Sequence, residues 1–169
     1  MWGHYVSEHV LTPKAKKEDK PFLIIMGDEA FYDKIDNKQA KHYLGDGLQS
    51  PLNSMEMWKK LDERFNIYLL RKSYPGYDDK IKAQWGEAIG SQKIIAAESA
   101  ERVVDQAIGI IAKGWGQYTI DFKKSMAARQ DDDIVKKVDE SIRAVPEEMI
   151  AAASKKTKKL SAAKSKKLV

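Results

Sequence analysis

The fold is decided by one apolar stretch, PFLIIMGDE at residues 21–29. Its centre, FLIIM, is continuously apolar with no alternation, which is the pattern of a parallel strand covered on both faces. Gly27, Asp28 and Glu29 follow directly. Ligands of open parallel sheets bind outside the carboxyl ends of the strands, so Asp28 is predicted at a ligand-binding or catalytic position. The alternative is that Asp28 caps the next turn through backbone amides.

The rest of the chain predicts alternating helices and strands. Helices are expected at 34–44, at 54–65 with Ser54 as N-cap, at 79–88, and from Ser99 to Gly114. Strands are expected at 66–71 and 93–96. The buried stripe of the helix after Ser99 is predicted to contain Val103, Val104, Ala107, Ile108 and Ile111. This order predicts the α/β class, with a three-layer, mostly parallel, Rossmann-like sheet and helices on both faces.

Four segments are predicted along the chain. Residues 1–20 form an N-terminal helix, over 1–12, and a charged linker; residues 21–116 form the α/β domain. Residues 117–150 form a helical extension in which aspartates at 131–133 favour a helix N-terminus and Ile134, Val138 and Ile142 repeat every four residues. Residues 151–169 form a basic tail that is predicted to be disordered.

The net charge of +5 comes from the C-terminal tail. The tail lysines are Lys155, Lys156, Lys158, Lys159, Lys164, Lys166 and Lys167. The remaining 23 basic residues face 25 acidic ones, so the rest of the 169-residue chain carries −2. A lysine tail without aromatic residues suits neutralisation of a phosphate backbone rather than base stacking. One predicted function is therefore a nucleic-acid-associated or scaffold protein that binds through this tail.

Several classes of chemistry lack their sequence signals. The chain has no cysteine, which excludes disulfides and thiolate nucleophiles and favours a cytoplasmic location. It has no phosphate loop and no GxSxG elbow. His4 and His9 are five residues apart, about 140° around a helix, which does not favour a shared zinc site. No apolar run approaches membrane-spanning length. A non-enzymatic protein without a membrane partner is predicted; a small nucleotide-dependent α/β enzyme is a further alternative.

Three segments together resemble a known family. They are PFLIIMGDEAFYDKID, SMEMWKKLDERFNIYLLRKSY and SQKIIAAESAERVVDQAIGIIAKG, within residues 20–114. They look like the C-terminal half of a von Willebrand factor A-type (vWA) domain of the microbial intracellular kind. In that family an aspartate at the end of a strand is one ligand of a metal-ion-dependent adhesion site. Asp28 matches it, with Glu29 where glycine is commoner. The family's first metal motif, Asp-x-Ser-x-Ser, is absent.

The resemblance implies a protein-interaction module with at most a partial or partner-completed adhesion site. Asp28 would be the metal ligand, Glu29 its weaker neighbour, and Asp78 and Asp79 would lie on the rim. Mg²⁺ would bind only if another chain supplied the missing ligands. Without the family's first strand, the strand at 22–26 becomes an exposed edge. A second copy, another polypeptide, or residues 1–12 folding back would then cover it.

Overall fold

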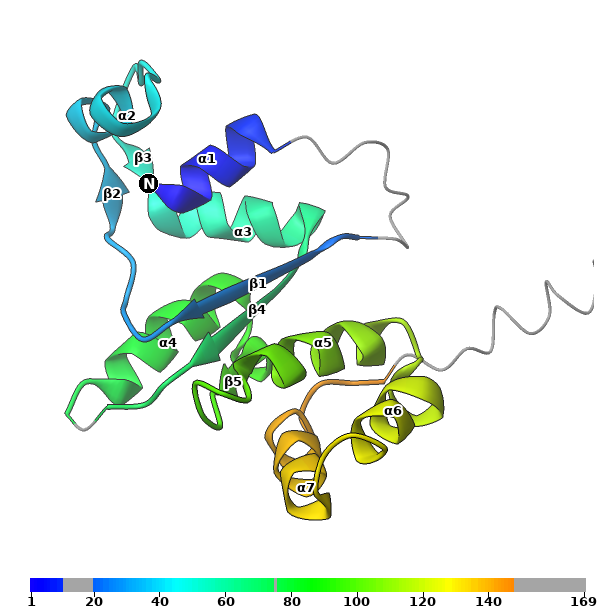
Figure 1. Cartoon of the computed structure of the whole chain (residues 1–169). Helices are drawn as coiled ribbons and strands as arrows, with labels where there is room; N and C mark the ends of the chain where they lie inside the picture. Colours follow the sequence, from blue (N-terminus) through cyan, green and yellow to red (C-terminus); the bar gives the residue numbers. More distant parts are fainter. Residues whose placement is uncertain (11–19, 75, 148–169) are drawn as a thin grey trace, which may run out of the picture. The chain divides into compact units, whose positions relative to one another are not determined.

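The computed structural model describes residues 1–10, 20–74 and 76–147 (Figure 1). The chain divides into two compact units, the first from Met1 to Val103 and the second from Val104 onward. The first unit is built on a small parallel sheet, and the second, where described, is helical. The α/β class is therefore confirmed at this level.

The sheet of the first unit has three parallel strands in the order β1-β4-β5. They are β1 (Phe22–Gly27), β4 (Asn66–Arg71) and β5 (Ile94–Ala96). All three match the apolar runs that predicted strands. In the described part of the chain β1 pairs only with β4, in a register that places Phe22 opposite Asn66. The predicted edge position of this strand is thus observed.

Two helices cover one face of the sheet and enclose the core. They are α3 (Ser54–Arg64) and α4 (Asp78–Ile89). Leu61 and Trp58 of α3 and Trp85 of α4 pack with Ile67 and Leu69 of β4. The N-cap of α3 is Asn53, whose side chain accepts a hydrogen bond from the Glu56 amide at 3.2 Å. The prediction of Ser54 as the cap was wrong by one residue. A short 3₁₀ helix, Ser91–Lys93, leads from α4 into β5.

The predicted helix at 34–44 is shorter than expected. Residues Lys34–Ile35 instead form β2, which pairs antiparallel with β3 (Leu52–Asn53). Helix α2 (Asn37–Leu44) begins after Asp36, whose carboxylate accepts from the Gln39 amide at 2.8 Å. It ends at Gly45, which has φ +78° and so adopts the left-handed conformation that glycine tolerates.

The N-terminal helix α1 (Trp2–His9) packs against α3 (Figure 1). A Cβ on Gly3 would lie 3.0 Å from Cζ2 of Trp58, so glycine permits this close approach. Arg64 donates to the carbonyls of Ser7 and Val10 at 2.7 and 3.1 Å. The helix predicted over 1–12 is therefore present, but it lies on α3 and adds no strand to β1. Residues 11–19, including most of the predicted linker, lie outside the described residues.

The second unit is described up to residue 147. Its elements are most of α5 (Val103–Gly114), a π-helical turn (Tyr118–Phe122), α6 (Lys123–Ala127) and α7 (Asp132–Ser141). The helix predicted to have its N-terminus at the aspartates 131–133 is present as α7, with Asp131 as its N-cap. The buried side of α5 carries Gln106, Gly109 and Ile110, whereas Val104 and Ile108 are exposed. The predicted stripe was therefore wrong at these two positions. None of the described helices has the length and apolar character to cross a bilayer.

Candidate functional site

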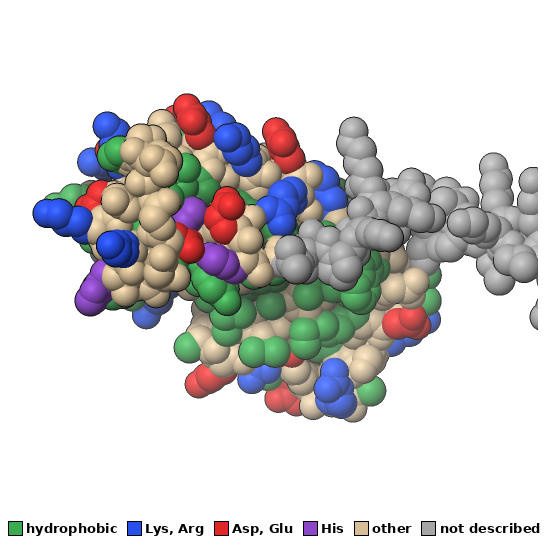
Figure 2. Space-filling view, turned by 90° about the horizontal axis from the view of Figure 1, so that it is seen from above, with side chains coloured by type: hydrophobic (Ala, Val, Ile, Leu, Met, Phe, Trp, Pro, Cys, Tyr) green, Lys and Arg blue, Asp and Glu red, His purple; other side chains and the backbone are tan. Residues whose placement is uncertain are grey.

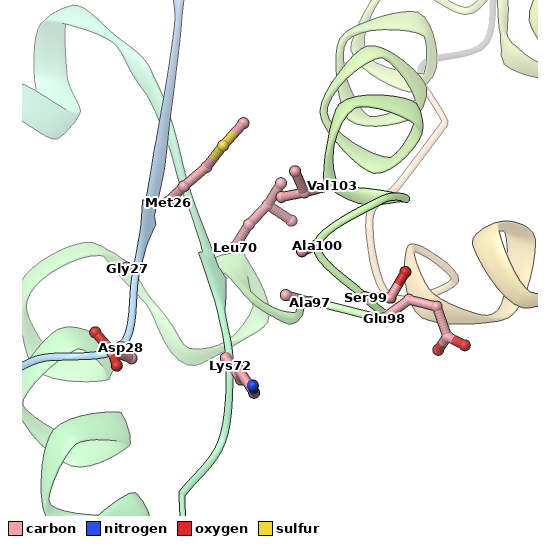
Figure 3. A pocket seen from close by; sticks show the side chains of 10 residues that line it. All are labelled: Met26, Gly27, Asp28, Leu70, Lys72, Ala97, Glu98, Ser99, Ala100 and Val103. Carbon is pink, nitrogen blue, oxygen red and sulfur yellow. The ribbon is translucent and has the colours of Figure 1, made fainter.

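A pocket of about 510 Å³ opens in the first unit where the three parallel strands end (Figure 3). Met26, Gly27 and Asp28 come from the end of β1, and Leu70 and Lys72 from the end of β4. The segment that follows β5 contributes Ala97, Glu98, Ser99, Ala100 and Val103. This is the position at which open α/β sheets bind ligands. The structure therefore places Asp28 in the lining of a pocket at the carboxyl ends of the strands.

The lining of this strand-end pocket combines an apolar part with charged groups. Figure 3 shows Met26, Leu70 and Val103 close together, Lys72 below them, and Ser99 beside Glu98 to their right. The Lys72 ammonium lies 5.5 Å from the centre of the Tyr74 ring, in a cation–π contact. Asp28, Lys72 and Glu98 give the pocket charges of both signs. The arrangement suits a ligand with an apolar body and a polar or charged end.

Helix α4 positions the loop that carries Asp28. Nε1 of Trp85 donates to the Glu29 carbonyl at 3.0 Å. Gln84 makes two hydrogen bonds to Phe31, accepting from its amide at 3.0 Å and donating to its carbonyl at 2.8 Å. These three bonds fix the backbone directly after β1 to the helix that packs below it. Trp85 and Gln84 therefore fix the chain that directly follows Asp28.

The other predicted acidic residues lie elsewhere. Glu29 is exposed and its side chain does not line the strand-end pocket. Asp78 and Asp79 lie in the first turn of α4. Asp79 lines a different hollow, together with Lys82. The structure thus brings Asp28, but none of the other three, to the strand-end pocket.

Asp78 is engaged in ion pairs. It accepts from Nη1 of Arg71, whose side chain is 2% exposed, and lies 2.5 Å from Nζ of Lys82. The Nε and Nη2 atoms of Arg71 are buried and meet no acceptor among the described residues. Asp78 is therefore the counter-charge of a buried cation, because a buried guanidinium is stable only when paired. This role explains its position without a ligand.

The ion pairs of Asp78 predict an acid-sensitive contribution to stability. Hydrogen bonds from Lys82 and Arg71 lower the pKa of Asp78 from 3.8 to about 2. Because the folded-state pKa is lowered, this contribution is fully present above pH 3.8 and is lost as the pH falls through about 2. We expect the chemical shift of the Asp78 carboxyl carbon in NMR spectra to titrate with a pKa near 2. Asp78→Asn is expected to reduce the loss of unfolding free energy between about pH 4 and pH 2, measured by urea unfolding at each pH. Asp79→Asn is the matched control; titration of Asp78 near 4 would contradict the assignment.

The metal site implied by the resemblance can be tested against the donor groups present. Among the described residues no group of three or more His, Asp or Glu side chains is arranged to hold a metal ion. Mg²⁺ requires several oxygen ligands, and Asp28 supplies one carboxylate. The tail lysines, Lys155 to Lys167, lie outside the described residues.

Comparisons with protein-family models, curated proteins and solved structures find no match for this chain. The vWA relationship accordingly stays a prediction. Lys72 and Ser99 were missed by the sequence argument, although a usable signal was present. Each follows a predicted strand, at 66–71 and 93–96, and the rule that selected Asp28 applies equally to the ends of these strands.

Proposed function

We propose that this chain is a cytoplasmic, non-enzymatic protein-interaction module, which binds a partner polypeptide along the free edge of β1 and in the adjoining strand-end pocket. The observation that carries the proposal is the edge position of β1, which has β4 as its single pairing partner in the described residues. A strand edge presents unpaired N–H and C=O groups, and an extended partner segment satisfies them by joining the sheet.

The direction of the backbone groups along β1 follows from its pairing. The Pro21 carbonyl accepts from the Asn66 amide at 2.8 Å, so it faces β4. In a parallel pair, residues alternate in the side to which their N–H and C=O point. Residues 23, 25 and 27 therefore face β4, and Ile24 and Met26 face the free edge. The strand contains neither lysine nor proline, which commonly protect natural edges.

The free edge and the strand-end pocket share residues. Met26 belongs to the edge and also lines the pocket, followed by Gly27 and Asp28. A strand paired with β1 therefore leads directly to the pocket, where its next side chain meets Asp28 and Lys72. On this proposal the sheet is part of a vWA-like, three-layer fold, and the partner supplies the strand that would lie beside β1.

The proposal predicts that changes on the edge abolish binding without unfolding the chain. Ile24→Pro removes an N–H that faces outward, which an edge strand tolerates. Met26→Lys places a charge on the edge. We expect each variant to lower the affinity of the interaction at least tenfold. The affinity is measured by sedimentation if the chain binds a second copy of itself, or with the purified partner once a captured protein has been identified. Val104→Lys is the matched control, because Val104 is 58% exposed and Met26 53% exposed. Binding that is insensitive to both edge variants would refute the proposal.

A second arm tests the role of Asp28. Asp28→Ala is expected to weaken partner binding while leaving thermal unfolding unchanged, because the side chain lines the pocket and is only partly buried. Repeating the measurement with EDTA separates two mechanisms. Loss of binding in EDTA would show that the partner completes a metal site, and unchanged binding would restrict Asp28 to direct contacts with the partner.

A further inference from the structure

A second hollow in the first unit has five aromatic rings in its lining. It has a volume of about 440 Å³. We call it the aromatic hollow and define it by Trp2, Phe31, Tyr32, Lys34, Tyr43 and Trp58. These side chains come from α1, the loop after β1, β2, α2 and α3. Side chains from these five parts of the first unit thus converge on one concave surface, which shares no lining residue with the strand-end pocket.

The rings at the base and at the rim of this hollow differ in exposure. Trp58 is buried, and the ring centres of Trp2 and Phe31 lie 6.3 and 6.2 Å from its own. Tyr32 and Tyr43 are 84% and 69% exposed. Packing in the core accounts for the position of Trp58. It does not account for the rings of Tyr32 and Tyr43, which are exposed to water. Exposed aromatic rings around a concave surface suit stacking against another planar ring.

The charge of the lining selects the kind of ring. Lys34 is the one charged side chain among the described residues that line the hollow, and no carboxylate lines it there. Lys38 and Lys41 are exposed on α2, which also contributes Tyr43. In Figure 2, Lys and Arg side chains stand out at the left end of the molecule, where α2 lies in Figure 1. An anionic group on the ligand would therefore meet an ammonium beside the rings.

We propose that the aromatic hollow binds a nucleobase that carries a phosphate, with the base stacked on the exposed rings and the phosphate beside Lys34. The volume lies within the range of small-molecule sites. Stacking of bases on aromatic side chains tolerates any base, because every base has a π face. The site is independent of the β1 edge and adds a ligand class to the proposed interaction module. A free nucleotide and a single-stranded oligonucleotide both carry this chemistry.

The test is calorimetric titration of the full chain with adenosine monophosphate and with adenosine. Tyr32→Ala and Tyr43→Ala are each expected to weaken nucleotide binding about tenfold, the loss typical of one base–aromatic stack. Tyr77→Ala is the matched control, because Tyr77 is 74% exposed and does not line the hollow. Lys34→Ala should weaken binding of the monophosphate but not of adenosine, and Lys60→Ala should change neither.

A second readout locates the ligand. The indole N–H signals of Trp2 and Trp58 are expected to shift in NMR spectra on addition of adenosine monophosphate, whereas that of Trp115 should not. Saturable binding that both tyrosine variants retain, or no saturable binding at all, would overturn the proposal. Equal losses for adenosine and its monophosphate in Lys34→Ala would overturn the phosphate assignment.

A short oligoadenylate distinguishes the two sources of the ligand. If it binds more tightly than the monophosphate and loses affinity in Tyr32→Ala and Tyr43→Ala, the ligand is single-stranded nucleic acid. If the two probes bind equally, the ligand is the free nucleotide. If oligoadenylate affinity is unchanged in both tyrosine variants and falls steeply with salt, the binding belongs to lysines elsewhere in the chain. This result would contradict the proposed site in the aromatic hollow.

Discussion

Replacing Trp85 with alanine is expected to lower the free energy of unfolding of the first unit by about 3–5 kcal/mol, the usual cost of removing a large buried aromatic ring. Trp85 is 4% exposed. Its ring lies 4.8 Å from that of Phe31, edge to face, and 5.0 Å from that of Trp58. The substitution therefore opens a cavity between α3 and α4 and also removes the hydrogen bond to Glu29. Urea unfolding followed by circular dichroism measures the loss.

A second variant separates the contribution of the hydrogen bond from that of ring packing, and a third is a control. Trp85→Phe keeps most of the ring contacts but cannot donate to the Glu29 carbonyl, so a loss of about 1 kcal/mol is expected from the missing hydrogen bond. Trp115→Ala is the matched control: Trp115 is exposed, and its removal should change stability by less than about 0.5 kcal/mol. A loss below about 1 kcal/mol for Trp85→Ala would contradict the packing described for this face of the sheet.

Replacing Ile142 with alanine is expected to lower the stability of the second unit by about 2–5 kcal/mol. Ile142 is fully buried, and its Cδ1 would lie 2.7 Å from a Cβ placed on Gly109. The glycine thus brings the end of α7 close to α5. Hydrogen exchange of amides in α5 and α7 reports this unit separately. Ile120→Ala, at an exposed isoleucine of the same unit, is the control and should leave exchange unchanged.

The same contact predicts a non-additive pair of substitutions. Gly109→Ala improves helix propensity by up to about 1 kcal/mol, but the new methyl group meets Cδ1 of Ile142. Ile142→Val deletes that carbon atom. In the Ile142→Val background Gly109→Ala should therefore be more favourable than in the original chain. Equal effects of Gly109→Ala in the two backgrounds would show that the contact carries no energy.

The strands and most helices could be predicted from sequence because their signals are local. Strands β1 and β4 each contain an uninterrupted apolar run, FLIIM and IYLL, and the N-terminus of α7 lies in the three aspartates at 131–133. The buried side of α5 could not be predicted in this way. Hydropathy favoured Val104 and Ile108, yet the second-unit core takes Gly109 and Ile110, because the packing of Ile142 and Tyr118 against Gly109 depends on tertiary contacts.

The candidate site shows the same division. Asp28 was found because it directly follows an apolar strand. The ion pair between Asp78 and Arg71 could not be predicted. Arg71 is the last residue of β4, and hydropathy does not reveal that its charged side chain is buried. His4 and His9 lie on different sides of a helix by spacing, yet Nε2 of each lies within 3.1 Å of an Asp46 carboxylate oxygen. One carboxylate thus contacts both histidines, which the spacing of the two residues along the helix does not reveal.

The register of β1 also bears on how the sheet assembles in time. Phe22 pairs with Asn66, whereas Leu69 of β4 pairs with Ile94 of β5, so the first pairing closes the longer loop. Loop closure costs more entropy as the loop lengthens, and non-local parallel pairing is slow for this reason. On a ribosome β1 is synthesised before β4. The apolar segment of β1 therefore has no pairing strand until β4 has been synthesised. During this interval aggregation and chaperone binding compete with folding.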